Sequence, residues 1–310
     1  MFVILDLEWN TAYSARTKSH LNEIIEFGAV KLDENYKEIE TFSMLIRPQV
    51  GKALTSLVEK LTHISNEDLK DADTFPHVLE RFKSFAEGCI LMAWGNMDIL
   101  TLLANCQYFL NNERLDFVRQ YVDLQKFCER CFHFEENAKQ IGLSTAAQEL
   151  EIKFDEQTLH RALADSRLEA ACFRRLLQKE ENKSILSEMI HPMNEEFYKK
   201  ILFKTVALTN LNDPKIDKKE MVMFCKKCGR RLKQKTAWKV VNNGFRARFL
   251  CEACKLDFEA NVRFRLKYEG VSVYKYMRKL VPKEAQEKQP PCVETCLLYT
   301  SPSPRDISGS

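Results

Sequence analysis

Short apolar runs alternate with amphipathic stretches over the first 178 residues. Residues 2–9 begin the chain as a β-branched, apolar run, which is typical of a buried strand. The predicted strands are 2–9, 22–33, 38–47, 89–94 and 118–124, and the predicted helices are 55–62, 75–86, 99–110, 124–132, 145–150 and 161–178. Three strands followed by alternating helices and strands predict a layered α/β fold with a mixed five-stranded sheet flanked by helices.

The pattern weakens after residue 178. Residues 179–220 are polar, have a helical spacing at the start and contain an Asn-Asp-Pro break at 212–214, so they are expected to be a connector. Alternation typical of strands returns on both sides of Asn242-Asn243-Gly244, a sequence that favours a type I′ hairpin turn. The predicted divisions are a domain at 1–178, a connector at 179–220, a small β module at 221–262 and a basic extension at 263–295.

Composition excludes several classes of protein. The chain has 310 residues, of which 45% are hydrophobic and 29% charged, as in an ordinary globular protein. It has no run of 18 apolar residues, so we expect no transmembrane helix and no membrane partner. An acidic residue within the first six positions, with no basic segment before it, argues against a secretory signal and predicts a cytoplasmic protein.

The last residues have an unusual sequence. Residues 296–306, Cys-Leu-Leu-Tyr-Thr-Ser-Pro-Ser-Pro-Arg-Asp, resemble the in-frame translation of a sequencing-library adapter. We therefore expect 296–310 to be an artefact and the native C-terminus to be missing.

Charge is distributed unevenly along the chain. Residues 1–220 hold 28 Lys and Arg against 36 Asp and Glu, whereas residues 221–290 hold 18 against 6. An acidic body joined to a strongly basic module indicates that the basic part faces a polyanion.

Two cysteine pairs lie in the basic module. Cys225 and Cys228 form one CxxC pair, Cys251 and Cys254 form the other, and 22 residues separate them. Disulfides are not expected, because we predict no export signal. The four thiolates are therefore predicted to hold one structural Zn²⁺ in a zinc ribbon. A module this small buries little apolar surface, so the metal would supply much of its folding energy.

Basic residues line one face of the predicted hairpin. Arg246 and Arg248 share a face that alternates with Phe245 and Phe249, and the same pattern recurs at 262–268. Rows of cations beside aromatic residues suit a nucleic-acid backbone with occasional base stacking. A solvated charged face remains the alternative.

Acidic residues and one histidine form a second candidate set. Asp6 and Glu8 are two apart on a predicted strand, so they point to one face, although a helix cap and a solvated acid are an alternative. Asp98 follows the fourth strand and, taken alone, would be an N-cap. His160 and Asp165 would lie about 140° apart on one regular helix, so they converge only if His160 precedes the helix that holds Asp165.

Together these residues resemble the DEDDh 3′→5′ exonucleases. The resemblance covers about residues 1–178. Within the family, the chain is similar to the Eri-type and bacterial sporulation-inhibitor-like branch, whose members favour RNA as substrate. It rests on Asp6-x-Glu8, Asp98 after an apolar strand, His160-x₄-Asp165, and the segments 5–9, 24–30, 94–95 and 143–147. It implies an RNase H-like fold and stepwise release of nucleoside 5′-monophosphates from a 3′ end.

The resemblance also assigns roles to residues. Two Mg²⁺ or Mn²⁺ ions would neutralise Asp6, Glu8, Asp98 and Asp165, because oxygen-only ligation favours these ions over zinc. His160 would take the proton of the attacking water.

Three further residues are candidate contacts to the terminal nucleotide: Leu7, Trp9 and His63. Core packing is the alternative for Trp9, and a core or cap position is the alternative for His63.

The sequence thus predicts a metal-dependent 3′→5′ exonuclease acting on single-stranded nucleic acid, with RNA favoured. A DNA-directed proofreading or repair exonuclease is one alternative. The other is a nucleic-acid-binding regulatory protein that uses the nuclease fold as a scaffold, which the presence of all five predicted catalytic residues disfavours.

Overall fold

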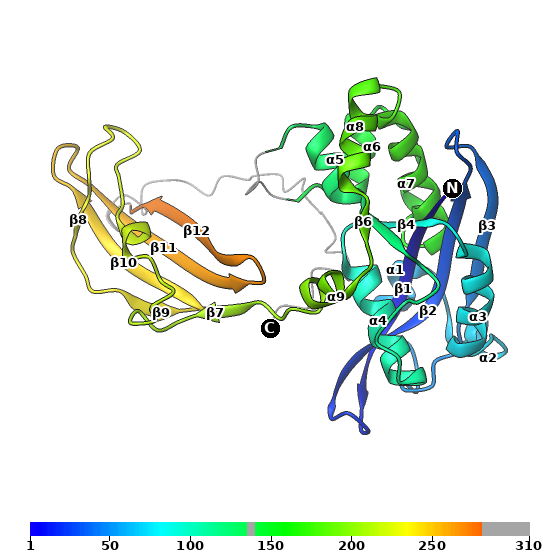
Figure 1. Ribbon diagram of the computed structural model, residues 1–310. Helices are drawn as coiled ribbons and strands as arrows, with labels where there is room; N and C mark the ends of the chain where they lie inside the picture. The colour runs from blue at the N-terminus through cyan, green and yellow to red at the C-terminus, as the bar shows by residue number, and fades with distance from the viewer. Residues whose placement is uncertain (135–139, 281–310) are drawn as a thin grey trace, which may run out of the picture. The chain divides into compact units, whose positions relative to one another are not determined.

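The computed structural model describes residues 1–134 and 140–280 (Figure 1). These residues form two compact units, of which the first ends at Ile201 and the second begins at Leu202. No helix in the described ranges is long and apolar enough to span a membrane. The end of the predicted basic extension and the adapter-like segment at 296–310 lie outside the described residues.

The first unit contains a six-stranded mixed sheet with the order β3-β2-β1-β4-β5-β6. Its strands are β1 (Phe2–Ser14), β2 (Ser19–Leu32), β3 (Glu38–Leu45), β4 (Ile90–Ala93), β5 (Gln120–Asp123) and β6 (His191–Pro192). β4 runs parallel to β1 and β5, and the other pairs are antiparallel. The predicted mixed α/β fold is therefore confirmed, with one short strand more than the five expected.

Helices cover both faces of this sheet. They are α1 (Ser56–Thr62), α2 (Asn66–Lys70), α3 (Phe75–Ala86), α4 (Met97–Leu110), α5 (Leu124–Cys131), α6 (Leu143–Glu149) and α7 (Ala162–Leu176). Strand periodicity in β1 divides the core in two, because Leu5 packs with Phe82 of α3 on one face and Ile4 packs with Phe173 of α7 on the other.

The segment after residue 178 differs from the expected connector. α8 (Glu180–Met189) buries Leu186 in the core beside α7, β6 pairs with β5, and α9 (Glu195–Ile201) buries Tyr198. The Tyr198 hydroxyl also accepts the N–H of Leu115 at 3.0 Å. A few apolar residues at helical spacing therefore fix this polar stretch to the first unit.

One sheet spans the second unit. Its strands are β7 (Val206–Leu208), β8 (Lys233–Gln234), β9 (Lys239–Val241), β10 (Gly244–Cys251), β11 (Leu256–Lys267) and β12 (Gly270–Lys279). β11 crosses the expected boundary at 262/263, because its alternation is continuous and it pairs with β7, β10 and β12. The predicted ribbon and basic extension therefore share one sheet.

The hairpin turn between β9 and β10 follows the sequence prediction. Asn242 and Asn243 have φ of 49° and 56°. Positive φ at both central residues defines a type I′ turn, which asparagine tolerates well.

Candidate active site

The site begins where β1 separates from β4. The two strands pair only from Phe2 to Ile4, whereas Asp6 and Glu8 lie further along β1. Asp6 is fully buried and Glu8 is 6% exposed, and both share the face of Ile4. Two carboxylates are therefore buried side by side at the carboxyl end of the parallel strands, the usual place for a ligand in such a sheet.

Asp98 enters this opening from the first turn of α4. Its side chain is fully buried, and Oδ1 accepts the N–H of Leu7 at 3.2 Å. That N–H is available because β4 does not extend beside this part of β1. The N-cap of α4 is Asn96, and Asp98 lies within the first turn of the helix. The alternative that Asp98 is the N-cap is therefore wrong.

Asp165 and His160 complete the acidic site. Asp165 lies in the first turn of α7 and is 7% exposed, whereas His160 lies before the helix in the left-handed region with φ of 64°. The N–H of His160 donates to Asp165 Oδ2 at 3.0 Å. One potential ligand atom from each of Glu8, His160 and Asp165 lies within 4.8 Å of the others. The loop-then-helix arrangement is the one that the sequence required for these two residues to meet.

Gly28 allows α7 to approach the sheet. It lies opposite Asp6 in the β1–β2 register, and a Cβ there would be 2.0 Å from Ala162 C and 2.1 Å from Leu163 N. The Ser166 hydroxyl donates to Gly28 O at 2.9 Å and closes the same contact. Only glycine lets the start of α7, and therefore Asp165, come this near to β2.

Glu26 and Arg161 hold the loop that contains His160. Glu26, paired with Glu8 across β1–β2, is buried at 1% exposure. Its carboxylate accepts Arg161 Nη2 at 2.8 Å and the N–H of Ala162 at 3.1 Å. This hydrogen bond raises the pKa of Arg161 above its usual range. Sequence reasoning missed this pair, although Arg161 directly follows His160.

The acidic set suits divalent cations. Asp6, Glu8, Asp98 and Asp165 are all buried, and Glu8 and Asp165 each place a ligand atom within 4.8 Å of the other and of His160. Buried carboxylates lose hydration and repel their neighbours, which is costly unless cations neutralise them. Oxygen ligands of this kind are those that Mg²⁺ and Mn²⁺ prefer. The residues present therefore fit a divalent-metal site.

The candidate nucleotide contacts fall in different surroundings. Leu7 and Trp9 are 1% and 4% exposed in the core, on the β1 face opposite Asp6. This placement favours core packing for Trp9, and the N–H of Leu7 donates to Asp98. His63 is exposed and is the left-handed C-cap of α1, so the cap alternative describes its place in the fold.

A family model described as RNase_T, exonuclease, matches residues 3–173. This match covers more than half of the chain. The chain belongs to the exonuclease family. It is a DEDDh-type member, and its mixed sheet is that of the RNase H-like nuclease fold.

Curated relatives match more than half of this exonuclease-family chain. A DNA polymerase III PolC-type protein from Caldanaerobacter subterraneus subsp. tengcongensis is 31% identical over 57% of this chain and 12% of its own length. The 3′-5′ exoribonuclease 1 of Rattus norvegicus is 30% identical over 56% of this chain and 52% of its own length. The chain thus spans about half, or less, of these relatives.

Solved structures resemble part of this chain at lower identity. The nuclease domain of 3′hExo, bound to rAMP, is 23% identical over 57% of this chain and 92% of that chain, with a TM-score of 0.47. Cell-death related nuclease 4 is 16% identical over 74% of this chain and 86% of that chain, with a TM-score of 0.48.

The second unit of this exonuclease-family chain brings its four predicted thiols together. The sulfur atoms of Cys225, Cys228, Cys251 and Cys254 all lie within 4.8 Å of one another. Gly229, with φ of 71°, donates its N–H to Cys225 O at 2.8 Å and closes the first CxxC turn. Four sulfur atoms from two such turns fit a tetrahedral metal site.

Ionisation in this cluster is unequal. Burial opposes ionisation of Cys225, but the N–H groups of Cys228 and Lys227 outweigh it and lower the pKa of Cys225 to about 7. The hydrogen bond with Cys228, together with burial, raises the pKa of Cys254 to about 12. One thiolate therefore forms readily, whereas four at once require a cation among them.

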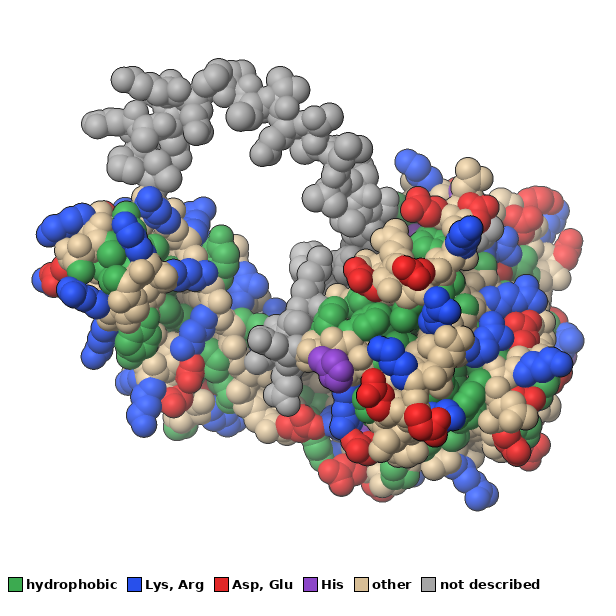
Figure 2. Space-filling view, turned by 90° about the horizontal axis from the view of Figure 1, so that it is seen from above, with side chains coloured by type: hydrophobic (Ala, Val, Ile, Leu, Met, Phe, Trp, Pro, Cys, Tyr) green, Lys and Arg blue, Asp and Glu red, His purple; other side chains and the backbone are tan. Residues whose placement is uncertain are grey.

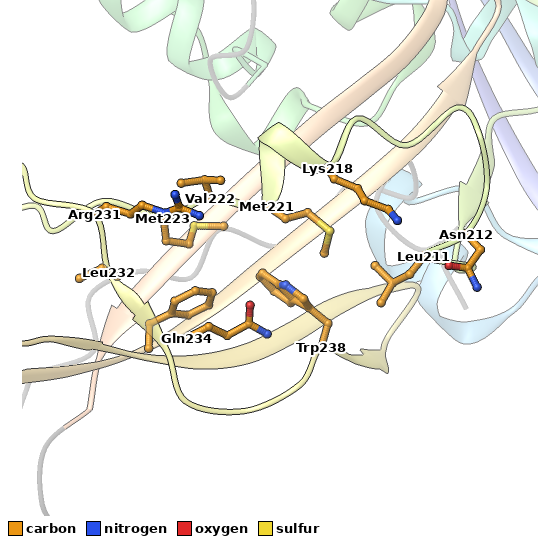
Figure 3. Close-up of a pocket in the computed structure, with 11 residues that line it drawn as sticks. Leu211, Asn212, Lys218, Met221, Val222, Met223, Arg231, Leu232, Gln234 and Trp238 are labelled. Carbon is orange, nitrogen blue, oxygen red and sulfur yellow. The ribbon is translucent and has the colours of Figure 1, made fainter.

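The second unit also has a cavity of about 430 Å³ on the core side of its sheet (Figure 3). Trp238 and Met221 contribute apolar walls, and Lys218 and Gln234 contribute polar groups. The lining comes from residues 211–249, so the cavity is separate from the acidic site.

Arg246 and Arg248 lie where the sequence placed them, on the β10 face opposite the core residues Phe245 and Phe249. Arg248 is exposed, and Arg246 donates to Asn261 Oδ1 at 3.1 Å. Lys and Arg side chains predominate over acidic ones on the side of the second unit that Figure 2 presents.

Proposed function

We propose that this protein is a 3′→5′ exonuclease that releases nucleoside 5′-monophosphates from single-stranded nucleic acid, RNA before DNA. The supporting observation is that β1, the start of α4 and the start of α7 bring buried carboxylates and His160 to one place. This is the combination that metal-assisted phosphodiester hydrolysis needs.

Asp6, Glu8, Asp98 and Asp165 would hold the cations. Two bound divalent cations would neutralise these carboxylates, polarise the scissile phosphate and acidify the attacking water. Asp98 is oriented for this role by the N–H of Leu7. Asp165 is fixed at the start of α7, where the contact of this helix with Gly28 sets its depth in the site.

His160 would accept the proton of the attacking water at its imidazole. Its backbone N–H is held by Asp165, but its side chain lies on a loop and is half-buried, so the ring can reach solvent. Arg161, which directly follows His160, is anchored by its ion pair with Glu26. The imidazole is therefore tethered close to the carboxylates without being enclosed by them.

The choice of RNA rests on the family resemblance and on the exoribonuclease relative. The DNA polymerase III PolC-type relative favours DNA as a second candidate substrate. Both candidates share the hydrolysis of a phosphodiester from a free 3′ end.

The four cysteines of the second unit would hold one structural Zn²⁺. Support comes from their mutual distances and from the lowered pKa of Cys225, since thiolates are the ligands that zinc prefers. Zinc would link the turn at 225–228 to the turn at 251–254 and so stabilise the sheet.

One assay tests the activity and the substrate together. Matched single-stranded RNA and DNA oligonucleotides, each with a free or a blocked 3′ end, are incubated with Mg²⁺ or Mn²⁺. We expect monophosphate release from free 3′ ends only, faster for RNA, and none without a divalent ion. Cleavage of blocked ends, or no cleavage of either polymer, would contradict the proposed function, and faster DNA cleavage would overturn the RNA preference.

A further inference from the structure

The sheet of the second unit has two unlike faces. One face packs on the core with Phe258, Val262 and Phe264 of β11. The other, which we call the outer face, bears the alternate residues of the same strands. Its residues on the three long strands include Arg246, Arg248, Asp257, Glu259, Asn261, Arg263, Arg265, Lys267, Tyr274, Tyr276 and Arg278.

Cations dominate the outer face. It carries six Arg and Lys residues on these strands against two carboxylates, Asp257 and Glu259. Arg263 and Arg265 are exposed, and no ion pair within the described part of the chain involves either of them. A row of exposed cations without acidic partners attracts a polyanion, and its binding weakens with salt.

Glu259 pairs with one cation of the outer face and lies near a second. It is 8% exposed and accepts Arg278 Nη2 at 2.8 Å, while Arg246 Nε lies 3.8 Å away. One buried acid therefore holds the Arg278 guanidinium of β12 and lies near that of Arg246, which Asn261 Oδ1 holds from β11. Because a fixed guanidinium loses less entropy on binding, such a pair suits recognition of phosphate oxygens.

The aromatic residues beside these cations are tyrosines of β12. Phe245, Phe249 and Phe264, which the sequence places next to the basic rows, are buried in the core and cannot stack on a ligand. Tyr276 and Tyr274 are instead 63% and 41% exposed on the outer face.

The sheet register places these tyrosines among the cations. Tyr274 pairs with Arg263 and Tyr276 with Asn261 across β11–β12. Two positions along one strand separate the rings by about 7 Å, which leaves room for a separate base on each.

We propose that the outer face binds single-stranded nucleic acid, with phosphates along Arg248, Arg263 and Arg265 and unpaired bases stacked on Tyr276 and Tyr274. The cations alone would suit any polyanion, but exposed rings between them favour a strand whose base faces are accessible. The inference extends the proposed function, because it gives the second unit a substrate-holding role that does not depend on hydrolysis.

Salt dependence tests the cations. Binding of a fluorescent oligonucleotide of single-stranded RNA, and of its DNA counterpart, is measured by anisotropy in the full chain bearing Asp165→Asn to suppress cleavage. The double variant Arg263→Gln/Arg265→Gln should lower the slope of log affinity against log salt by about 1.4, since each phosphate contact on a single strand contributes about 0.7. The matched control, Lys215→Gln/Lys219→Gln, removes two exposed cations of the same unit from outside the outer face. An equal change in both double variants would overturn the localised site.

Stacking is tested at the most exposed ring. Tyr276→Leu should weaken single-strand binding about tenfold without changing the salt slope, whereas Tyr276→Phe should retain the affinity. Binding of a blunt duplex should be unaffected by Tyr276→Leu, because paired bases do not offer their faces. Unchanged single-strand affinity in Tyr276→Leu would refute stacking. Equal losses for duplex and single strand would identify the face as a general polyanion surface.

The same measurements separate this inference from the proposed function. Suppose that the outer-face variants lose oligonucleotide binding and that the unsubstituted chain cleaves nothing. The inference would then stand, and the exonuclease proposal would be refuted. If the unsubstituted chain cleaves the oligonucleotide but no outer-face variant changes binding, the exonuclease proposal would stand and the outer-face inference would be refuted.

Discussion

Gly28→Ala offers a direct test of how the fold builds the acidic site. The added Cβ would lie 2.0 Å from Ala162 C and 2.4 Å from Ala162 O, both backbone atoms of α7. Carbon atoms pack at about 3.5 Å or more, so the start of α7 must withdraw by about 1.5 Å or β2 must give way. No side-chain rotation can relieve this contact, because the clashing atoms belong to the backbone.

Two consequences follow from that displacement. Forcing an extra carbon into a close-packed contact costs about 1–3 kcal/mol of folding free energy. Asp165 moves with α7, and a misplacement of about 1 Å in a catalytic constellation lowers the rate about a hundredfold. We therefore expect a folded, destabilised protein with a large loss of hydrolysis and weaker Mn²⁺ binding.

The assay combines urea denaturation, Mn²⁺ titration and steady-state hydrolysis of single-stranded RNA at a temperature where both proteins are folded. Gly142→Ala is the matched control, because its φ of −75° suits alanine and the nearest atom to its Cβ is 4.0 Å away. Adding Ala162→Gly to Gly28→Ala should not restore activity, since it removes no backbone atom. Wild-type stability, metal affinity and turnover in Gly28→Ala would refute the reasoning.

Three further predictions concern the carboxylates and the cysteine cluster. Asp165→Asn should lower hydrolysis at least a hundredfold with an unchanged circular dichroism spectrum, and near-normal turnover would exclude it as a ligand. Glu26→Gln leaves the half-exposed Arg161 without its anionic partner, so urea denaturation should show a loss of about 1–2 kcal/mol in the free energy of unfolding. The control Glu38→Gln weakens an exposed pair with Arg167 and should change this free energy by less than about 0.5 kcal/mol. Chelation of zinc should expose residues 221–260 to proteolysis but leave cleavage of short oligonucleotides intact, and a complete loss of cleavage at restored Mg²⁺ would make the cysteine cluster part of the active centre.

Local pattern predicted most elements of the first unit. The helix expected at 75–86 is α3 without change, and the fourth strand and the helix after it differ by two residues or fewer at each end. Strand periodicity also placed Asp6 and Glu8 on one face, opposite Trp9. These properties depend on neighbours within a few residues, so the sequence alone determines them.

The extent of elements that depend on distant partners was less predictable. β1 continues to Ser14, beyond the predicted end at residue 9, because its polar end pairs with β2 as far as Ser19. Residues 179–201 join the first unit because a few apolar side chains find places in a core built mainly by other segments. Neither feature has a strong local signal.

The amino-acid sequence was enough to name the candidate residues of the acidic site, because short motifs carry their own spacing and residue types. The contacts that assemble the site come from folding: Glu26 binds Arg161 across 135 positions of the chain, and Leu7 binds Asp98 across 91. The register of β12 on β11 also brings Tyr274 and Tyr276 to the face that bears the arginines. Contacts of this kind arise from strand register and close packing between segments far apart in sequence, and local periodicity contains no information about either.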